Sequence, residues 1–222
     1  GQVIITEVIP TVTTTSTTGD TVELYNAGGS AVSLTGWILS DGDPDSVEGA
    51  NFDLEGSFAP NALGLPSLQP GEFAVVVITL DTGTASFVDT NYGYLITAPL
   101  LASGGAFDGD YDQVFLLNAG EVLQDSVVWG VTGSAPSNDA RDDLARLTTP
   151  TSGWFTLNAA NGWSGADAIA DQAAYNAVDI DNTGFTAVST FGAASIQRLN
   201  TGTTWSQGAP DSSANFVVTP RH

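Results

Sequence analysis

Apolar residues recur along this chain mostly at every second position or in short continuous runs, and Gly, Asn, Asp and Pro bound these runs. A period of two is typical of strands with one buried face, and short bounded runs are typical of sandwich strands. Residues 118–121, Asn-Ala-Gly-Glu, separate two such runs and predict a hairpin turn. The pattern predicts strands at residues 2–9, 21–26, 32–40, 72–80, 112–118, 122–130, 194–199 and 215–219.

Two segments depart from the strand pattern. Residues 11–18 are almost entirely Thr and Ser, which predicts a loop or an exposed edge. Residues 164–179 are the helix candidate, because Ser164 suits an N-cap and Ile169, Ala173 and Ala177 share one stripe. The sequence therefore predicts an all-β protein with one short helix inserted into it.

The composition narrows the class of protein and its partners. With 222 residues the chain is long enough for one large β-sandwich, so we expect a single domain over residues 1–222. It has 25 Asp and Glu against 4 Arg and no Lys, which gives a formal net charge of -21. Nucleic acids and anionic membranes are bound through Lys and Arg, so this charge excludes nucleic acid as a partner and disfavours an anionic membrane.

Besides Lys, two further residue types are missing, Cys and Met, and each absence carries an expectation. Without Cys there is no disulfide, no thiolate nucleophile and no thiolate zinc site, so the core alone holds the fold. Without Met, even at position 1, a chain that begins after removal of a signal peptide is favoured. The longest apolar run, residues 73–80, is far shorter than the roughly 20 residues that span a bilayer. We expect a secreted, extracellular or cell-surface protein without membrane insertion.

Four segments follow one another along the chain: Val-Ile-Ile-Thr-Glu-Val, Val-Glu-Leu-Tyr-Asn, Val-Ser-Leu-Thr-Gly-Trp-Ile-Leu-Ser-Asp and Leu-Gln-Pro-Gly-Glu-Phe. In this order they resemble the first three strands and the next turn of the lamin-tail domain family. The later hairpin and the closing segment are also similar. The resemblance extends from residue 3 to about residue 211 and is carried by residues 3–8, 22–26, 32–41, 68–73, 112–130, 195–198, Trp205 and 208–210.

This resemblance implies an immunoglobulin-like β-sandwich, a domain found in nuclear lamins and in secreted bacterial and archaeal proteins, sometimes beside nuclease or phosphatase domains. It implies no catalytic residues. Residues at about 42–65, 81–111 and 131–193 interrupt the resemblance, and we interpret them as loop insertions. The resemblance therefore implies an all-β, immunoglobulin-like β-sandwich with loop insertions and one short helix.

Four residues within the matching segments carry structural expectations. Gly36 and Trp37 fit a strand bend followed by a large core anchor, and Trp129 is also assigned to the core. Glu23 alternates with apolar neighbours and is expected to face away from the core, exposed or anchoring a loop.

Carboxylates recur at alternate positions in Asp-Gly-Asp-Pro-Asp-Ser-Val-Glu, which begins at Asp41. Asp41, Asp43 and Asp45, with Glu48 or a carbonyl, can supply most of the 6 to 8 oxygens that calcium takes. The glycine and glutamate positions of an EF-hand are missing. The alternative is a solvated acidic loop. The same spacing recurs at Asp108, Asp110 and Asp112, and in a shorter form at Asp179 and Asp181.

Catalytic readings find little support in the residues. The single His, His222, ends the chain and is a poor place for a base that needs fixed geometry. A carboxylate pair for glycoside hydrolysis stays open, although no spacing singles one out. Arg146 and Arg198 each precede a Trp, which favours ion pairing or aromatic stacking as their role.

We therefore predict a non-catalytic extracellular structural or adhesive module, stabilised by calcium. The alternatives are an accessory domain of a larger secreted hydrolase and a carbohydrate-binding domain with glycans as partners. Beyond the resemblance, residues 213–219 include a short strand-like run that needs a sheet edge. It pairs either within its own sandwich or, as an exchanged strand, with a second copy in an oligomer or filament. The assembly residues in the second case are Asn215, Phe216, Val217, Val218 and Thr219.

Overall fold

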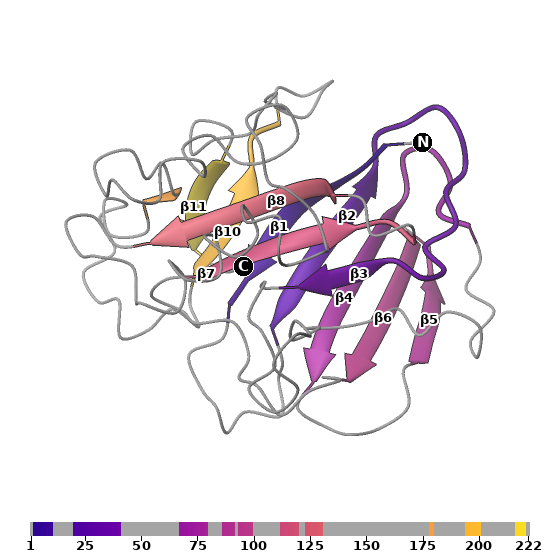
Figure 1. Ribbon diagram of the computed structural model, residues 1–222, viewed down its shortest axis with the longest axis horizontal. Coiled ribbons are helices and arrows are strands. Elements are labelled where there is room, and N and C mark those ends of the chain that lie inside the picture. The colour runs from indigo at the N-terminus through magenta and orange to yellow at the C-terminus, as the bar shows by residue number, and fades with distance from the viewer. Residues whose placement is uncertain are drawn as a thin grey trace, which may run out of the picture.

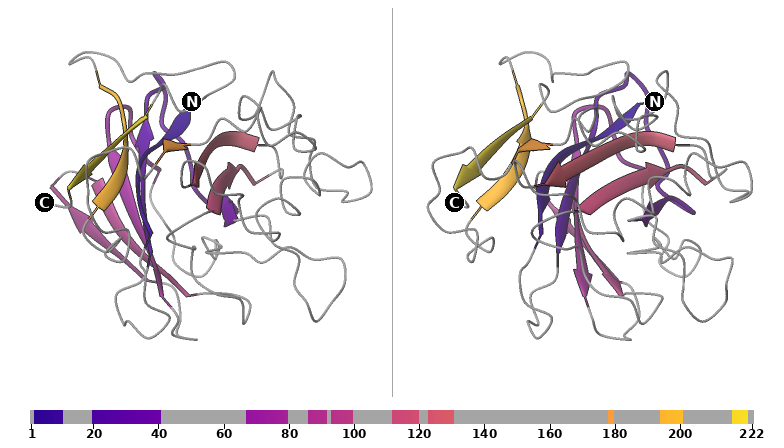
Figure 2. Two further views of the ribbon diagram at one scale, coloured as in Figure 1. Left: turned by 90° about the vertical axis from the view of Figure 1, so that its left-hand side faces the viewer. Right: turned by 60° about the vertical axis from the view of Figure 1, so that its left-hand side comes forward.

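The computed structural model describes residues 2–10, 20–40, 67–79, 86–91, 93–99, 112–119, 123–130, 178–179, 194–200 and 216–220. In this part of the chain the strands are β1 Val3–Ile9, β2 Thr21–Asn26, β3 Ile38–Ser40, β4 Phe73–Thr79, β5 Ser86–Thr90, β6 Gly93–Pro99, β7 Asp112–Leu117, β8 Leu123–Gly130, β9 Val178–Asp179, β10 Ala194–Arg198 and β11 Phe216–Pro220. They form two facing sheets, with the smaller in front of the larger in Figure 1 and both seen from the side in Figure 2.

Both sheets are mainly antiparallel. The larger has seven strands in the order β11-β10-β1-β2-β4-β6-β5, and the smaller has four in the order β3-β7-β8-β9. The two parallel pairings join β4 to β6 and β8 to β9. Strands β7 and β8 pair as the hairpin that the Asn-Ala-Gly-Glu turn predicts.

The core lies between the two sheets. Val22 and Leu24 of β2 are fully buried, whereas the residues that alternate with them, Thr21, Glu23 and Tyr25, are partly exposed, which is the alternation that the sequence shows. Buried side chains from the other strands of the larger sheet and from the smaller sheet complete this core. The fold is therefore an all-β sandwich of the immunoglobulin-like kind, as expected. Its fully buried apolar residues include Ile5, Val8, Ala74, Val76, Leu39, Val114, Leu116, Val127 and Trp129.

The strand predicted at residues 32–40 is much shorter in the structure. Strand β3 covers only Ile38–Ser40, because the chain turns before it: Gly36 has a φ of 77° and the Trp37 N–H donates to the Leu34 carbonyl at 3.1 Å. A side chain at Gly36 would also approach the Cβ of Ala119 to 3.0 Å. Trp37 is buried just after the bend, and Trp129 is fully buried, so the expected core roles of both are confirmed.

Residues 81–111, interpreted as a loop insertion, contain two strands of the larger sheet. β6 runs parallel to β4 and β5 closes that end of the sheet. Gly93 makes the close parallel approach possible: its φ is 136°, and a Cβ there would lie 1.7 Å from the Phe73 carbonyl oxygen. A run of strand-forming residues, Tyr-Leu-Ile-Thr from Tyr94, was the signal for β6 in the sequence.

The helix predicted at residues 164–179 is wrong over its last two residues. Val178 and Asp179 form β9, which pairs in parallel with Trp129 and Gly130 of β8. Backbone pairing with an open sheet edge outweighs a weak local helix pattern here. The rest of that segment, and the Thr-rich residues 11–18, lie outside the described residues. No described helix is long and apolar enough to cross a membrane.

The terminal strand pairs within its own chain. Ala194–Arg198 of β10 lies antiparallel to Phe216–Pro220 of β11, with Gln197 opposite Val217. This is the intramolecular one of the two arrangements expected for this segment. Exchange of the strand with a second copy stays a prediction, and Asn215 lies outside the described residues. Pairing within one chain is favoured because the tether gives β11 a high effective concentration at the β10 edge.

Candidate functional site

The residues expected to bind calcium lie almost entirely outside the described part of the chain. This holds for Asp41, Asp43, Asp45, Glu48, Asp108 and Asp110. The exception is Asp112, which begins β7 opposite Trp129 of β8. Among the described residues, no group of three or more His, Cys, Asp or Glu side chains is placed to hold a metal ion.

The backbone nevertheless brings the ends of the acidic segments together. β3 ends at Ser40, which lies opposite Phe115 of β7, and β7 begins at Asp112. β8 ends at Gly130, which lies beside Asp179 at the end of β9. All three acidic segments of the sequence thus meet the smaller sheet at the same end, because β7 runs antiparallel to both β3 and β8, and β9 runs parallel to β8.

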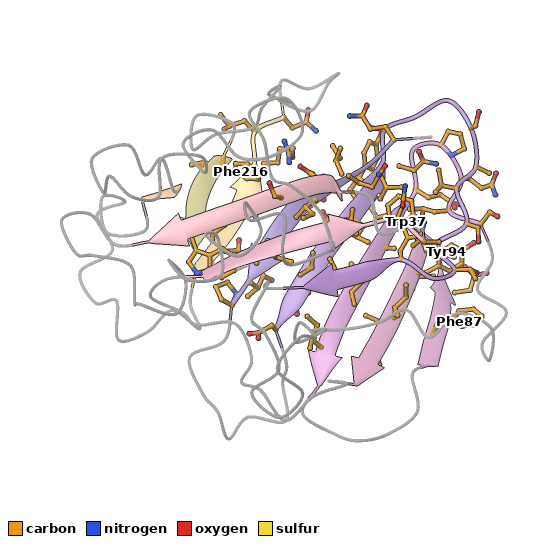
Figure 3. The ribbon with its side chains drawn as sticks, in the orientation of Figure 1. Trp37, Phe87, Tyr94 and Phe216 are labelled. Atoms are coloured by element: carbon orange, nitrogen blue, oxygen red, sulfur yellow. The ribbon has the colours of Figure 1, made fainter. Side chains whose placement is uncertain are left out.

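A buried ion pair joins the two sheets. Asp125 on β8 of the smaller sheet accepts from the Arg198 Nη2 at 3.0 Å through Oδ1 and at 2.8 Å through Oδ2. The two side chains are 3% and 0% exposed. The Arg198 guanidinium also lies over the ring of Phe216, with its central carbon 4.5 Å from the ring centroid. Phe216 in Figure 3 marks the end of the larger sheet at which this contact forms.

The ion pair also completes the hydrogen bonding of β1. Strand β1 pairs with β10 at Glu7 and Val8, and the register with β2 shifts between Ile5 and Glu7. The Ile5 N–H donates to Asp125 Oδ2 at 2.6 Å, and the Ile5 carbonyl accepts from Arg198 Nε at 2.7 Å. Asp125 Oδ1 also accepts from the Ser126 N–H at 2.9 Å. The two charged side chains therefore act as partners for a buried stretch of backbone as well as for each other.

This geometry indicates a structural role for the pair. Oxygens of Asp125 accept four hydrogen bonds, which hold the carboxylate in one orientation between β8 and β1. The sequence predicted ion pairing or stacking for Arg198, and the structure shows both. Its partner carried no local signal, because Asp125 lies 73 residues away and is one of 25 acidic residues.

A pair of carboxylates lies on the outer face of the larger sheet, away from the buried ion pair. Glu7 and Glu23 stand directly opposite each other on β1 and β2. Glu23 Oε1 accepts from the Thr6 hydroxyl at 2.7 Å, and Glu7 Oε1 accepts from Gln197 Nε2 at 3.0 Å. Glu23 faces away from the core as expected, although it is only partly exposed.

The surroundings of Glu23 penalise its charge. Burial raises the pKa of the Glu23 carboxyl above its usual value, the Thr6 hydrogen bond opposes this rise, and the nearby Glu7 adds to it. Like charges directly opposite each other in a sheet are destabilising. The charged Glu23 side chain therefore destabilises the folded state at neutral pH.

The comparisons with known proteins agree with this architecture. The family model of the lamin tail domain matches residues 1–131, which is more than half of the chain. The chain therefore belongs to the lamin tail domain family, a family of immunoglobulin-like structural domains. Comparisons with curated proteins and with solved structures gave no match.

The matched segment ends just after β8, yet both sheets continue beyond it. β9 pairs with β8, and β10 pairs with β1. The Asp125–Arg198 pair joins the matched segment to β10, 67 residues beyond its end (198 minus 131). The closing strands are thus part of the same sandwich.

Proposed function

We propose that this chain is a non-catalytic structural module of the extracellular space or cell surface, stabilised by calcium and able to associate with copies of itself. The observation that supports the structural role is the buried ion pair between Asp125 and Arg198. It commits charged side chains to holding two sheets together, which is consistent with a load-carrying or scaffolding domain.

The sequence supports the extracellular location. The chain combines a formal net charge of -21 with no Cys and a composition rich in Thr, Ser, Asn and Gly. Calcium or other divalent cations outside the cell would offset this charge. A module of this composition is suited to a medium in which cations are abundant.

Support for calcium comes from the position of the strand ends. β3 leads into the segment of Asp41, Asp43 and Asp45, and β7 begins at Asp112 at the same end of the smaller sheet. Calcium needs 6 to 8 oxygen ligands, which one short segment rarely supplies alone. Two acidic segments that enter the sheet side by side are a natural source of such a set.

Thermal denaturation with and without calcium tests this proposal. A ligand that binds only the folded state stabilises it by about 2.7 kcal/mol at 100 times its Kd, so calcium should raise the Tm and a chelator should lower it. Asp43→Asn should reduce the calcium-dependent shift. Glu7→Gln is the matched control, because Glu7 lies on the outer face of the larger sheet, away from those strand ends. A Tm that is the same with calcium and with chelator would reject the site.

One observation favours the carbohydrate-binding alternative. Tyr25 and Phe73 contact each other on the outer face of the larger sheet, with ring centroids 4.7 Å apart and ring planes tilted by 45°, and both are partly exposed. Aromatic faces on an open sheet surface suit the apolar faces of sugars. Glycan-array binding that is lost in Tyr25→Ala, with the Tm retained, would favour a glycan-binding or accessory role over a purely structural one.

A further inference from the structure

The larger sheet ends in two edge strands, which lie far apart. In the described sheet order β11 is the first strand and β5 the last. Figure 3 labels Phe216 at the β11 end and Phe87 at the β5 end. Six strand spacings of about 4.8 Å place the two edges about 29 Å apart, so they cannot meet within one molecule.

The two edge strands have opposite directions. β10 and β2 both run antiparallel to β1, and β11 runs antiparallel to β10, so β11 points the same way as β1. β4 runs antiparallel to β2 and parallel to β6, and β5 runs antiparallel to β6. β5 therefore points opposite to β11. A second copy displaced along the sheet would set its β11 antiparallel to β5 of the first, with the same face outward.

The edges also carry matching side chains on one face. One row crosses all seven strands on the face away from the core, and its two ends are apolar. Val88 is 59% exposed at the β5 end, Leu95 beside it is 39% exposed, and Val217 is 40% exposed at the β11 end. The row consists of Val217, Gln197, Glu7, Glu23, Val75, Leu95 and Val88.

The charge of the molecule leaves few places where two copies can approach. With a formal net charge of -21 and no Lys, most surfaces of two copies repel each other. β11 contains no charged residue, and β5 contains one, Asp89. Natural sheet edges are commonly protected from pairing by Lys, which is missing here.

We propose that β11 of one copy pairs antiparallel with β5 of the next, with Val217 beside Val88, so that the larger sheet continues from copy to copy. The inference rests on the proposed self-association and names its interface. No strand leaves its own sandwich. Because the two contacting surfaces differ, the contact does not close on itself as a dimer and leads to an open, twisted filament.

Cysteine cross-linking tests the interface directly, because the chain has no Cys of its own. Opposed residues of antiparallel strands lie within the Cα spacing that a disulfide needs. The double variant Val88→Cys/Val217→Cys, oxidised in calcium-containing buffer, should give a ladder of multimers on a non-reducing gel that collapses on reduction. Leu95→Cys/Val217→Cys is the matched control, because Leu95 is as exposed as Val217 but lies one strand inside the edge. It should give no ladder.

The outcomes separate the interface from self-association itself. Covalent dimers from Val217→Cys or Val88→Cys alone would indicate like-with-like edge pairing and overturn the proposal. Multimers by light scattering without a ladder would reject this interface while self-association stands. Protein that stays monomeric in calcium at every concentration would reject both.

A charge placed at the edge gives an independent measurement. Val88→Lys should abolish the concentration-dependent scattering, because it removes the apolar contact of Val88 with Val217 and places on the edge strand the residue that commonly protects edges from pairing. Leu95→Lys adds the same charge one strand further in and should retain it. Equal loss in both variants would show that charge, and not the β5 edge, controls assembly, and would overturn the proposal.

Discussion

Removing one member of the Asp125–Arg198 pair should strongly destabilise the fold. In Asp125→Ala the guanidinium of Arg198 stays buried without its anion, and the Ile5 N–H loses its acceptor at 2.6 Å. Loss of one partner of a buried ion pair costs about 3–5 kcal/mol, and an unsatisfied buried N–H adds about 1–3 kcal/mol. The expected loss is therefore about 4–8 kcal/mol, a large share of the roughly 5–15 kcal/mol that stabilises a typical domain.

Arg198→Met should cost a similar amount for two reasons. It leaves the Asp125 carboxylate buried without its cation and removes the Nε donor to the Ile5 carbonyl. The double variant Asp125→Ala/Arg198→Met holds no uncompensated charge, so it should lose less than the sum of the two single losses. Because neighbouring groups in one network are coupled, we expect the shortfall to be at least about 2 kcal/mol.

Urea denaturation measures the stability of the unchanged protein, the two single variants and the double variant, which together form a double-mutant cycle. The free energy of unfolding falls linearly with urea, and the midpoint and slope give its value for each variant. Asp89→Asn, at an exposed acid of β5, is the control and should change the free energy by less than about 0.5 kcal/mol. Losses below about 1 kcal/mol in the single variants, or losses that simply add, would refute the inference that the pair joins the sheets.

Three further predictions concern single residues of the larger sheet. Glu23→Gln should stabilise the protein at neutral pH, because the pKa of Glu23 is raised in the folded state and the charged carboxylate therefore costs stability as the pH rises through that pKa. The stability gained by the variant should shrink as the pH falls towards 4.5 and below. A gain that is constant with pH would contradict the assignment. Gly93→Ala should cost at least about 2 kcal/mol, because φ is 136° and the Cβ would meet the Phe73 carbonyl; Gly29→Ala, where a Cβ meets nothing within 4 Å, should be nearly neutral in the same denaturation assay. Asn26→Ala should cost about 1–3 kcal/mol, because Nδ2 donates to the Ser30 and Leu68 carbonyls at 2.9 Å; an unchanged Tm would show that these bonds are replaced by water.

The local sequence pattern was sufficient to predict a strand and its core-facing residues where one face of the strand is buried and the other is not. In β2, Val22 and Leu24 alternate with half-exposed neighbours, and this alternation predicted both the strand and its core face. The bend at Gly36 and the burial of Trp37 and Trp129 followed from residue type in the same way. Each of these features depends on a few neighbouring residues, which is the range over which sequence periodicity carries information.

Strand pairing was decided by the tertiary structure, because ladder hydrogen bonds join backbones and leave little trace in side chains. The parallel pairing of β4 with β6 turned a predicted insertion into part of the sheet. The terminal strand β11 pairs with β10 of the same sandwich, and Val178 and Asp179, at the end of a predicted helix, pair with β8 as strand β9.

The candidate site divides in the same way between sequence and structure. The acidic spacing around Asp43 was visible in the sequence, whereas the position of Ser40, Asp112 and Asp179 at one end of the smaller sheet depends on strand direction. That Arg198 needed a partner followed from its scarcity among carboxylates. That the partner is Asp125, with the Ile5 backbone between them, follows only from the packing of two sheets, since pairing across the core is set by distance in space and not along the chain.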